Sequence, residues 1–318
     1  GRDSLRDLMV SIEPHKPKYY HLGFGKGSSR SNFANANEKR DCRIFEEYAF
    51  YLIDLARKSS IVDQDFLLNM DGNIYAFDST TIDLCLSVFW WAKFRTTKGG
   101  IKLHTLYDVK TSIPSFIHIS PASVHDVNAL DLLYYEPSGY YILDRGYVDY
   151  ERLFRIHQSS AYFVVRSKDN LKFRRMYSNK VNKDNGVLLD QIGKLTGFYV
   201  SKDYPEKLRH IKFYDEETDN NLEFLSNSFD ITAEEIAQLY KYRWKVELFF
   251  KCIKQHLKIK SFGGTSINAV KIQVYSAIIA YCMIALVRNK LKVDRSTYEI
   301  LQILSISIFE KVSVNQLF

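Results

Sequence analysis

Short apolar runs of four to seven residues recur along the first half of the chain and predict β-strands. They lie at Asn73 to Asp78 (NIYAFD), Ile101 to Tyr107, Ser115 to Ile119, Tyr140 to Leu143 and Ala161 to Val165. Helix caps and helical spacing predict helices from Ser123 or Asp126 to Leu133, and from Tyr150 to His157. We therefore expect three antiparallel strands, a helix, a strand, a helix and a strand: an α/β (α+β) chain whose mixed five-stranded sheet is flanked by helices.

The pattern changes outside this region and suggests four segments. Residues 1–70 are expected to form a basic arm followed by a helix from about Arg43 to Lys58, and residues 71–166 the first part of the core. Residues 167–227 are highly charged, with turn signals between short alternating runs, which predicts a β-rich insertion. Residues 228–318 would complete the core, with one helix from Thr232 to about His256 and an apolar helix from about Ala269 to Lys290.

The composition excludes several classes of protein. With 46% hydrophobic and 25% charged residues, the chain is an ordinary globular one. Its four cysteines are far apart, so neither a zinc knuckle nor a dense disulfide framework is expected, and a reducing cytoplasm is the natural location. The most apolar stretch, Val274 to Val287, has 14 residues, whereas a membrane span needs about 20. No secretory leader is apparent, and the abrupt first residues favour a trimmed chain or a fragment.

Three carboxylates are the candidate catalytic groups. Asp78 and Asp144 each follow an apolar strand, and neighbouring strands would bring both acids to one edge of the sheet. Glu247 lies on the predicted helix further along the chain. Carboxylates without cysteine or a histidine cluster suit a hard cation, Mg²⁺ or Mn²⁺. Two such ions can activate a water or a 3′-hydroxyl for attack on phosphorus.

The helix around Glu247 carries most of the positive charge of the chain. The formal net charge is +7, and Tyr240 to Lys260 contains seven Lys or Arg residues and one acid. On an uninterrupted helix, Tyr240, Arg243, Glu247 and Lys254 would share one face, within an arc of about 60°. A plain solvated helix, with Glu247 paired to Arg243 or Lys251, is the alternative. The basic residues and the aromatic ones favour a nucleic acid as partner.

At these positions the chain resembles bacterial insertion-sequence DDE transposases of the subgroup with a Tyr-x2-Arg-x3-Glu-x6-Lys signature. Tyr240, Arg243, Glu247 and Lys254 match its spacing, and AFDSTTIDL and ILDRGYVDY resemble the two aspartate regions. The resemblance implies a ribonuclease-H-like core in which Asp78, Asp144 and Glu247 bind two Mg²⁺ or Mn²⁺ ions. It also implies cleavage at transposon ends and transfer of the freed 3′-hydroxyl into target DNA, without a covalent enzyme intermediate.

The same resemblance implies how DNA is held. Double-stranded DNA, as terminal repeats and target, would be the partner of a dimer on paired ends. The residues expected to contact it are Tyr240, Arg243, Trp244, Lys251, Lys254, Lys98 and Lys102. Some relatives flip a terminal base against an aromatic residue, for which Trp90, Trp91 and Trp244 are candidates. Trp90 and Trp91 lie in the apolar run VFWWAKF and are more simply explained as core residues.

Alternatives remain for single residues and for the function. Asp83 could replace Asp78 if the strand were longer, and Asp126 is more simply a helix N-cap than a ligand. His118 and His125 lack further ligands at zinc-site spacing. The glycines of GFGKGSSRS lack the phosphate-loop frame, so no nucleotide cofactor is expected. The rival functions are a ribonuclease-H-like nuclease without strand transfer and an inactive or domesticated DNA-binding relic. The protein itself is expected in the bacterial cytoplasm, associated with the nucleoid.

Overall fold

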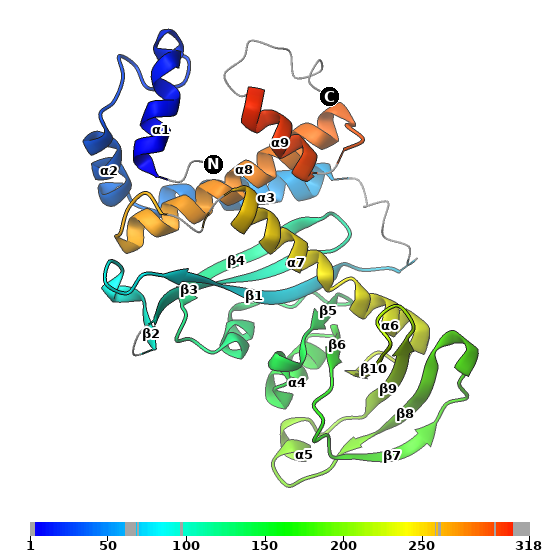
Figure 1. The fold of residues 1–318 in the computed structure, drawn as a ribbon. Helices are drawn as coiled ribbons and strands as arrows, with labels where there is room; N and C mark the ends of the chain where they lie inside the picture. The colour runs from blue at the N-terminus through cyan, green and yellow to red at the C-terminus, as the bar shows by residue number, and fades with distance from the viewer. Residues whose placement is uncertain are drawn as a thin grey trace.

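The strands of the chain form one continuous sheet. The computed structural model describes residues 4–60, 68, 70–95, 98–257, 259, 262–295 and 297–307 (Figure 1). The described strands form a sheet of ten, in the order β2-β3-β1-β5-β6-β10-β9-β8-β7. The tenth strand, β4, lies off this path and pairs with β3. Their bounds are β1 Ile74–Leu84, β2 Lys93–Arg95, β3 Lys98–Asp108, β4 Ile113–Pro121, β5 Tyr140–Leu143, β6 Tyr162–Arg166, β7 Phe173–Ser178, β8 Val187–Leu195, β9 Leu208–Asp215 and β10 Asn220–Ser226.

The expected five-stranded core is confirmed within this sheet. β1, β3 and β4 are antiparallel neighbours, and β5 and β6 continue the sheet in parallel with β1. β1 is longer than the sequence suggests, because it does not end at Asp78 but runs on to Leu84 against β3. Its pairing with the short β5 does end at Phe77 and Leu143. Asp78 therefore marks the end of the parallel ladder, not the end of the strand.

Helices cover both faces of the sheet (Figure 1). The described α-helices are α1 Leu5–Ile12, α2 Arg30–Lys39, α3 Arg43–Ser59, α4 Tyr150–Gln158, α5 Val200–Asp203, α6 Ala233–Lys241, α7 Trp244–Lys251, α8 Ile267–Leu291 and α9 Thr297–Ser307. α3, α6, α7 and α8 bury apolar side chains on one face of β1, β5 and β6. α4 packs on the opposite face with the 3₁₀-helix Asp126–Leu132, where a full helix was expected. The N-terminal arm is more helical than its polar sequence indicates, with both α1 and α2.

The insertion extends the core sheet and is not a separate layer. β10 pairs with β6 over three residues and continues antiparallel to β9, so β7 to β10 form the far end of the same sheet (Figure 1). The buried ion pair of Arg209 with Asp190, at 2.8 Å, joins β8 to β9. The sheet thereby connects the insertion to the strands that carry the candidate acids.

The helix expected from Thr232 to His256 is present but irregular. Thr232 and Glu235 form a capping box at its start. Near Arg243, four backbone N–H groups donate three residues back, as in a 3₁₀ turn, and this separates α6 from α7. A π-helical segment, Cys252–His256, then follows α7 and contains Lys254. The signature residues therefore do not lie on one uniform α-helix, and the 60° arc was too simple.

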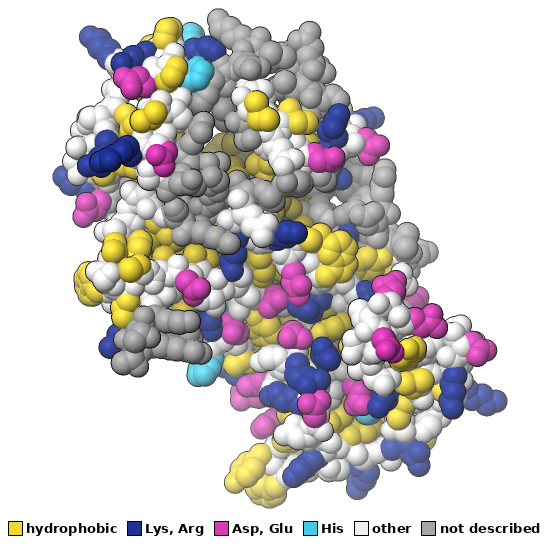
Figure 2. Space-filling model, in the orientation of Figure 1, with side chains coloured by type: hydrophobic (Ala, Val, Ile, Leu, Met, Phe, Trp, Pro, Cys, Tyr) yellow, Lys and Arg dark blue, Asp and Glu magenta, His cyan; other side chains and the backbone are white. Residues whose placement is uncertain are grey.

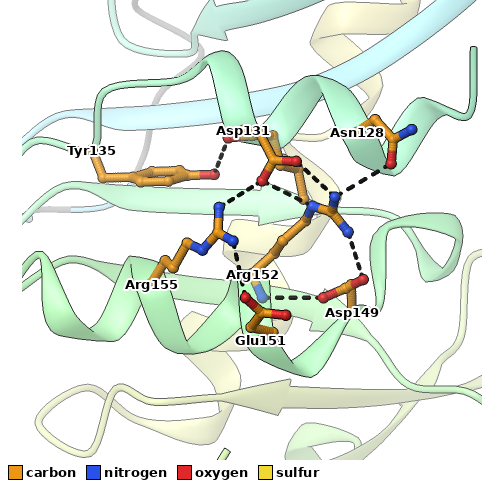
Figure 3. A network of polar contacts seen from close by, with 8 residues as sticks. Asn128, Asp131, Tyr135, Asp149, Glu151, Arg152 and Arg155 are labelled. Atoms are coloured by element: carbon orange, nitrogen blue, oxygen red, sulfur yellow. Dashed lines mark hydrogen bonds and ion pairs between the residues drawn. The ribbon is translucent and has the colours of Figure 1, made fainter. Parts of the chain in front are cut away.

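A cluster of ion pairs fixes α4 beneath the sheet (Figure 3). Arg152 donates two hydrogen bonds to Asp131 and one to Asp149, the last at 2.7 Å. Arg155 donates to Asp131 at 2.7 Å and to Glu151 at 3.0 Å. Because Asp131 lies in the 3₁₀-helix and both arginines in α4, the pairs join two elements that flank β5. We call these residues the α4 clamp.

Helix α8 is the apolar helix expected near the C-terminal end. By length and composition it is the one helix of the described part of the chain that could cross a membrane. Just over half of its most apolar stretch is buried against the rest of the fold, largely by α3 and the sheet. Its composition is therefore explained by its position as a core helix.

Candidate active site

The two aspartates lie side by side at the carboxyl ends of parallel strands. Phe77 of β1 pairs with Leu143 of β5, so Asp78 and Asp144 are the next residues on adjacent strands. Alternate residues of a strand share a face, and Ala76 and Ile142 pack on the side of α6 and α7. Asp78 and Asp144 therefore belong to that face. Asp83 is five positions from Asp78 and belongs to the opposite face, which favours Asp78 even though the strand is longer than expected.

Arg243 links Asp78 to Glu247. Its Nη1 donates to Oδ2 of Asp78 at 3.1 Å, and its Nη2 lies 2.7 Å from Oε1 of Glu247. Both Arg243 and Asp78 have side chains that are 20% exposed, whereas Glu247 is 53% exposed. The third acid thus reaches the site through a shared arginine, one turn before it on the helix.

Asp78 has two further partners and a shifted pKa. Its Oδ1 accepts hydrogen bonds from the backbone N–H of Ser79 at 2.8 Å and from the hydroxyl of Tyr147 at 3.5 Å. Burial raises the pKa of Asp78 to about 6, although the Ser79 hydrogen bond and the charge of Arg243 lower it. The charges of Asp144 and Glu247 raise it further. The three carboxylates are thus electrostatically coupled.

Tyr240 and Lys254 make contacts within the protein. The buried hydroxyl of Tyr240 donates to Oδ1 of Asp144 at 3.0 Å, and Nζ of Lys254 donates to the backbone oxygen of Thr81 at 2.6 Å. The guanidinium of Arg243 lies 5.7 Å from the centre of the Tyr240 ring. Of the signature residues, Tyr240 and Arg243 therefore contact carboxylates of the site, Glu247 is one of these carboxylates, and Lys254 contacts the strand that carries Asp78.

Asp126 is a neighbour that sequence reasoning assigned to a cap. The N-cap of its 3₁₀-helix is His125, which makes no side-chain cap. The carboxylate of Asp126 accepts from the hydroxyl of Ser79 and from Lys102, whose Nζ is 3.1 Å away. Lys102 also donates to the backbone oxygen of Val124 and is largely buried. No local feature of the sequence marks Asp126 as a neighbour of the site, because only the fold brings its carboxylate to Ser79.

The remaining predicted DNA contacts differ in exposure. Trp244 is about half exposed and Lys251 is exposed, both on α7. The side chain of Lys98 lies outside the described residues. The expectation that Trp90 is a core residue is wrong, because it is 78% exposed, whereas Trp91 is partly buried and its Nε1 donates to the backbone oxygen of Thr265. Both tryptophans lie in a short 3₁₀-helix, Trp90–Ala92, between a turn and β2, so neighbouring tryptophans point in different directions.

The donor set of the site suits a hard divalent cation. Asp78, Asp144 and Glu247 offer only carboxylate oxygens, the ligands that Mg²⁺ and Mn²⁺ prefer. Within the described residues, no three acidic, histidine or cysteine side chains converge closely enough to form a metal cage. The positive charge between Asp78 and Glu247 is instead the guanidinium of Arg243.

The chain is similar to known transposases. Residues 69–283 match a family described as "Transposase DDE domain". The chain is 34% identical over 273 residues to transposase y4zB of Sinorhizobium fredii, covering 85% of this chain and 73% of that protein. It is 28% identical over 289 residues to a transposase for insertion sequence element IS4SA of Synechocystis, covering 89% and 79%.

Two further matches cover little more than half of the known proteins. A transposase for insertion sequence element IS5377 of Geobacillus stearothermophilus is 29% identical over 216 residues, which cover 65% of this chain and 54% of that protein. A solved structure of the piggyBac transposase synaptic complex with hairpin DNA is 8% identical, with a TM-score of 0.45, over 76% of this chain and 53% of that one. Because the family match spans most of the chain, and includes Asp78, Asp144 and Glu247, the chain belongs to the DDE transposases of bacterial insertion sequences.

Proposed function

We propose that the chain cleaves the phosphodiester bond at transposon ends and joins the freed 3′-hydroxyl to target DNA, with Mg²⁺ or Mn²⁺ as cofactor. The observation that carries the proposal is the single carboxylate-rich edge: Asp78 and Asp144 end one parallel ladder, and Arg243 brings Glu247 to Asp78. The three acids come from three separate elements and share a single arginine between Asp78 and Glu247. Metal-dependent phosphoryl transfer requires such a set.

Each residue of the site has a definable task. Asp78, Asp144 and Glu247 would hold two cations, which would supply an activated oxygen nucleophile and stabilise the leaving oxygen. Tyr240 orients Asp144 through its hydroxyl, and Lys254 anchors the helix to β1. Arg243 must give up an ion pair to either acid when a cation or a phosphate competes for it.

We propose double-stranded DNA as the partner, bound across α6 and α7. On the face shown in Figure 2, basic and acidic side chains gather together where these helices cross the strand ends. Trp244 and Lys251 are exposed there and can meet DNA directly. Five further residues are proposed to contact phosphates: Tyr240, Arg243, Lys254, Lys102 and Lys98. The first four would then exchange their present contacts within the protein for contacts with DNA. A dimer on paired ends, in the bacterial cytoplasm near the nucleoid and without a nucleotide cofactor, completes the proposal.

Replacement of Glu247 by glutamine tests the chemistry. Glu247→Gln removes a charge but keeps the shape, so cleavage of DNA that carries the element's own ends should fall by at least about 1000-fold, while DNA binding should change less than about threefold. Glu216→Gln, an exposed acid on the insertion, is the matched control and should cleave normally. If Glu247→Gln lost binding and thermal stability together with cleavage, Glu247 would be a structural residue.

A second assay separates the rival functions. An oligonucleotide that already ends in the 3′-hydroxyl of the transposon end should be joined to target DNA by the wild-type protein in Mg²⁺ or Mn²⁺. Cleavage without joining would assign a ribonuclease-H-like nuclease. Binding without either reaction, in both metals, would assign a DNA-binding relic. Anomalous scattering from a Mn²⁺-soaked crystal, within about 2.5 Å of the three acids, would locate the ions independently of activity.

A further inference from the structure

Arg166 occupies the position on β6 that corresponds to the two aspartates. The register Phe77, Leu143 and Val165 runs across the parallel strands β1, β5 and β6. The next residues on these strands are Asp78, Asp144 and Arg166. Val164 packs on the same face as α6, and two positions further the strand ends with Arg166 on that face. A guanidinium is therefore aligned with the two acids at one edge of the sheet.

Three other cations near this edge have partners within the protein. Arg145 pairs with Asp169 at 2.9 Å, Lys168 donates to the backbone oxygen of Val148, and Arg243 holds Asp78 and Glu247. For Arg166, no ion pair or hydrogen bond of the side chain exists among the residues that the structure describes, and its Nε is buried without a partner. A buried donor in this state is costly and calls for an acceptor.

The nearest acid does not supply that acceptor. Oδ1 of Asp144 accepts from Tyr240, and the charge of Arg166 acts on the same tyrosine, lowering a pKa that burial raises to about 12. Arg166 thus lies close to the Tyr240–Asp144 pair without bonding to it. A guanidinium group that lies beside a reacting centre without a protein partner is well suited to bind phosphate oxygens.

We propose that Arg166 binds a phosphate of the DNA strand on the Asp144 side of the site. This inference rests on the proposed function, since it names a further residue that holds the same substrate. Arg243 lies on the Asp78 side, so the two arginines would flank the row of acids. The expected ligand is a backbone phosphate rather than a base. Arg166 lies beside carboxylates, which repel the phosphates of DNA, and its positive charge would offset that repulsion.

The test compares Arg166→Ala with Arg166→Lys and with Arg174→Ala. Arg174 is exposed on β7, far along the sheet, so its loss removes the same charge away from the site. Binding of a 30-base-pair duplex would be measured by fluorescence anisotropy over a series of KCl concentrations, and the thermal midpoint of each variant by scanning fluorimetry. Cleavage of DNA carrying the element's ends would be measured under single-turnover conditions.

The loss of one phosphate contact should change both the salt dependence of DNA binding and the rate of cleavage. Arg166→Ala should reduce the slope of log K against log[salt] by about 0.9, whereas Arg166→Lys and Arg174→Ala should keep the wild-type slope. Cleavage by Arg166→Ala should fall about 100-fold, with the thermal midpoint unchanged. An unchanged slope in Arg166→Ala, or a slope change equalled by Arg174→Ala, would overturn the inference. Failure of the wild-type protein to bind DNA would instead refute the proposed function.

Discussion

Two clusters of arginine and carboxylate groups in this molecule have opposite electrostatic consequences. In the α4 clamp, hydrogen bonds from Arg152 hold the pKa of Asp131 below its usual value, with Arg155 adding to the effect. In the active site, burial raises the pKa of Asp78 to about 6 in spite of Arg243. The difference lies in solvation and in the count of charges. The active site buries its acid and sets one arginine against three carboxylates, whereas the clamp sets two arginines against three, so the active site keeps the larger excess of negative charge.

Removing one arginine from each cluster should lower the free energy of unfolding by different amounts. Arg243→Ala leaves Asp78 buried and unpaired beside two other acids, and should lower the free energy of unfolding of the metal-free protein by about 3 kcal/mol. Arg152→Ala removes an equally shielded side chain, but its acids remain partly exposed to water, so about 1 kcal/mol is expected. Chemical denaturation in EDTA measures both values.

Divalent cations should then distinguish the clusters. If the acids hold Mn²⁺, millimolar MnCl₂ should raise the thermal midpoint of Arg243→Ala more than that of the wild-type protein, because the ion no longer competes with the guanidinium. The midpoint of Arg152→Ala should rise only as much as that of the wild-type protein. An equal response of Arg243→Ala and the wild-type protein would show that Arg243 and the cation do not compete.

The raised pKa of Asp78 makes its charge a pH-dependent cost. The folded chain binds this proton more tightly than the unfolded chain, whose pKa is near 3.8, so ionisation of Asp78 destabilises the fold progressively as the pH rises from about 3.8 to about 6, and the loss stays constant at higher pH. In EDTA, Asp78→Asn should match the wild-type stability near pH 4 and exceed it by about 1 kcal/mol at pH 7.5. Urea denaturation across this range measures the difference. A constant difference would mean that Arg243 keeps Asp78 ionised throughout.

Much of this site could be predicted from local sequence. Asp78 and Asp144 each follow a compact apolar run, and such a run reports burial and strand formation directly. Tyr240 and Arg243 still reach the acids across the 3₁₀ turn, Tyr240 through Asp144 and Arg243 through Asp78 and Glu247. The positions of the acids therefore needed only periodicity and one signature.

Long-range pairing could not be predicted in the same way. β1 continues past Asp78 because β3 pairs with it as far as Leu84, and nothing in the sequence of β1 specifies that length. The partners of Lys102 and the isolation of Arg166 depend on which strands become neighbours. Trp90 was misassigned because an apolar neighbourhood in sequence does not fix the direction of a side chain in a turn. Register, rather than composition, decides each of these.

The smallest predicted effect concerns Asp131, whose pKa is shifted in the opposite direction to that of Asp78. The pKa of Asp131 is lowered in the folded chain, so its ionised form stabilises the fold above the unfolded pKa of 3.8, and this contribution is lost as the pH falls below that value. Asp131→Asn should therefore be less stable than the wild-type protein by about 0.5 kcal/mol at pH 7, a value kept small because water screens this partly exposed group. The deficit should shrink below pH 4, whereas the gain from Asp78→Asn grows with rising pH. If the stability differences of the two variants changed with pH in the same direction, the pKa values of Asp78 and Asp131 would be shifted in the same direction. The active site would then have no excess of negative charge for a cation to neutralise.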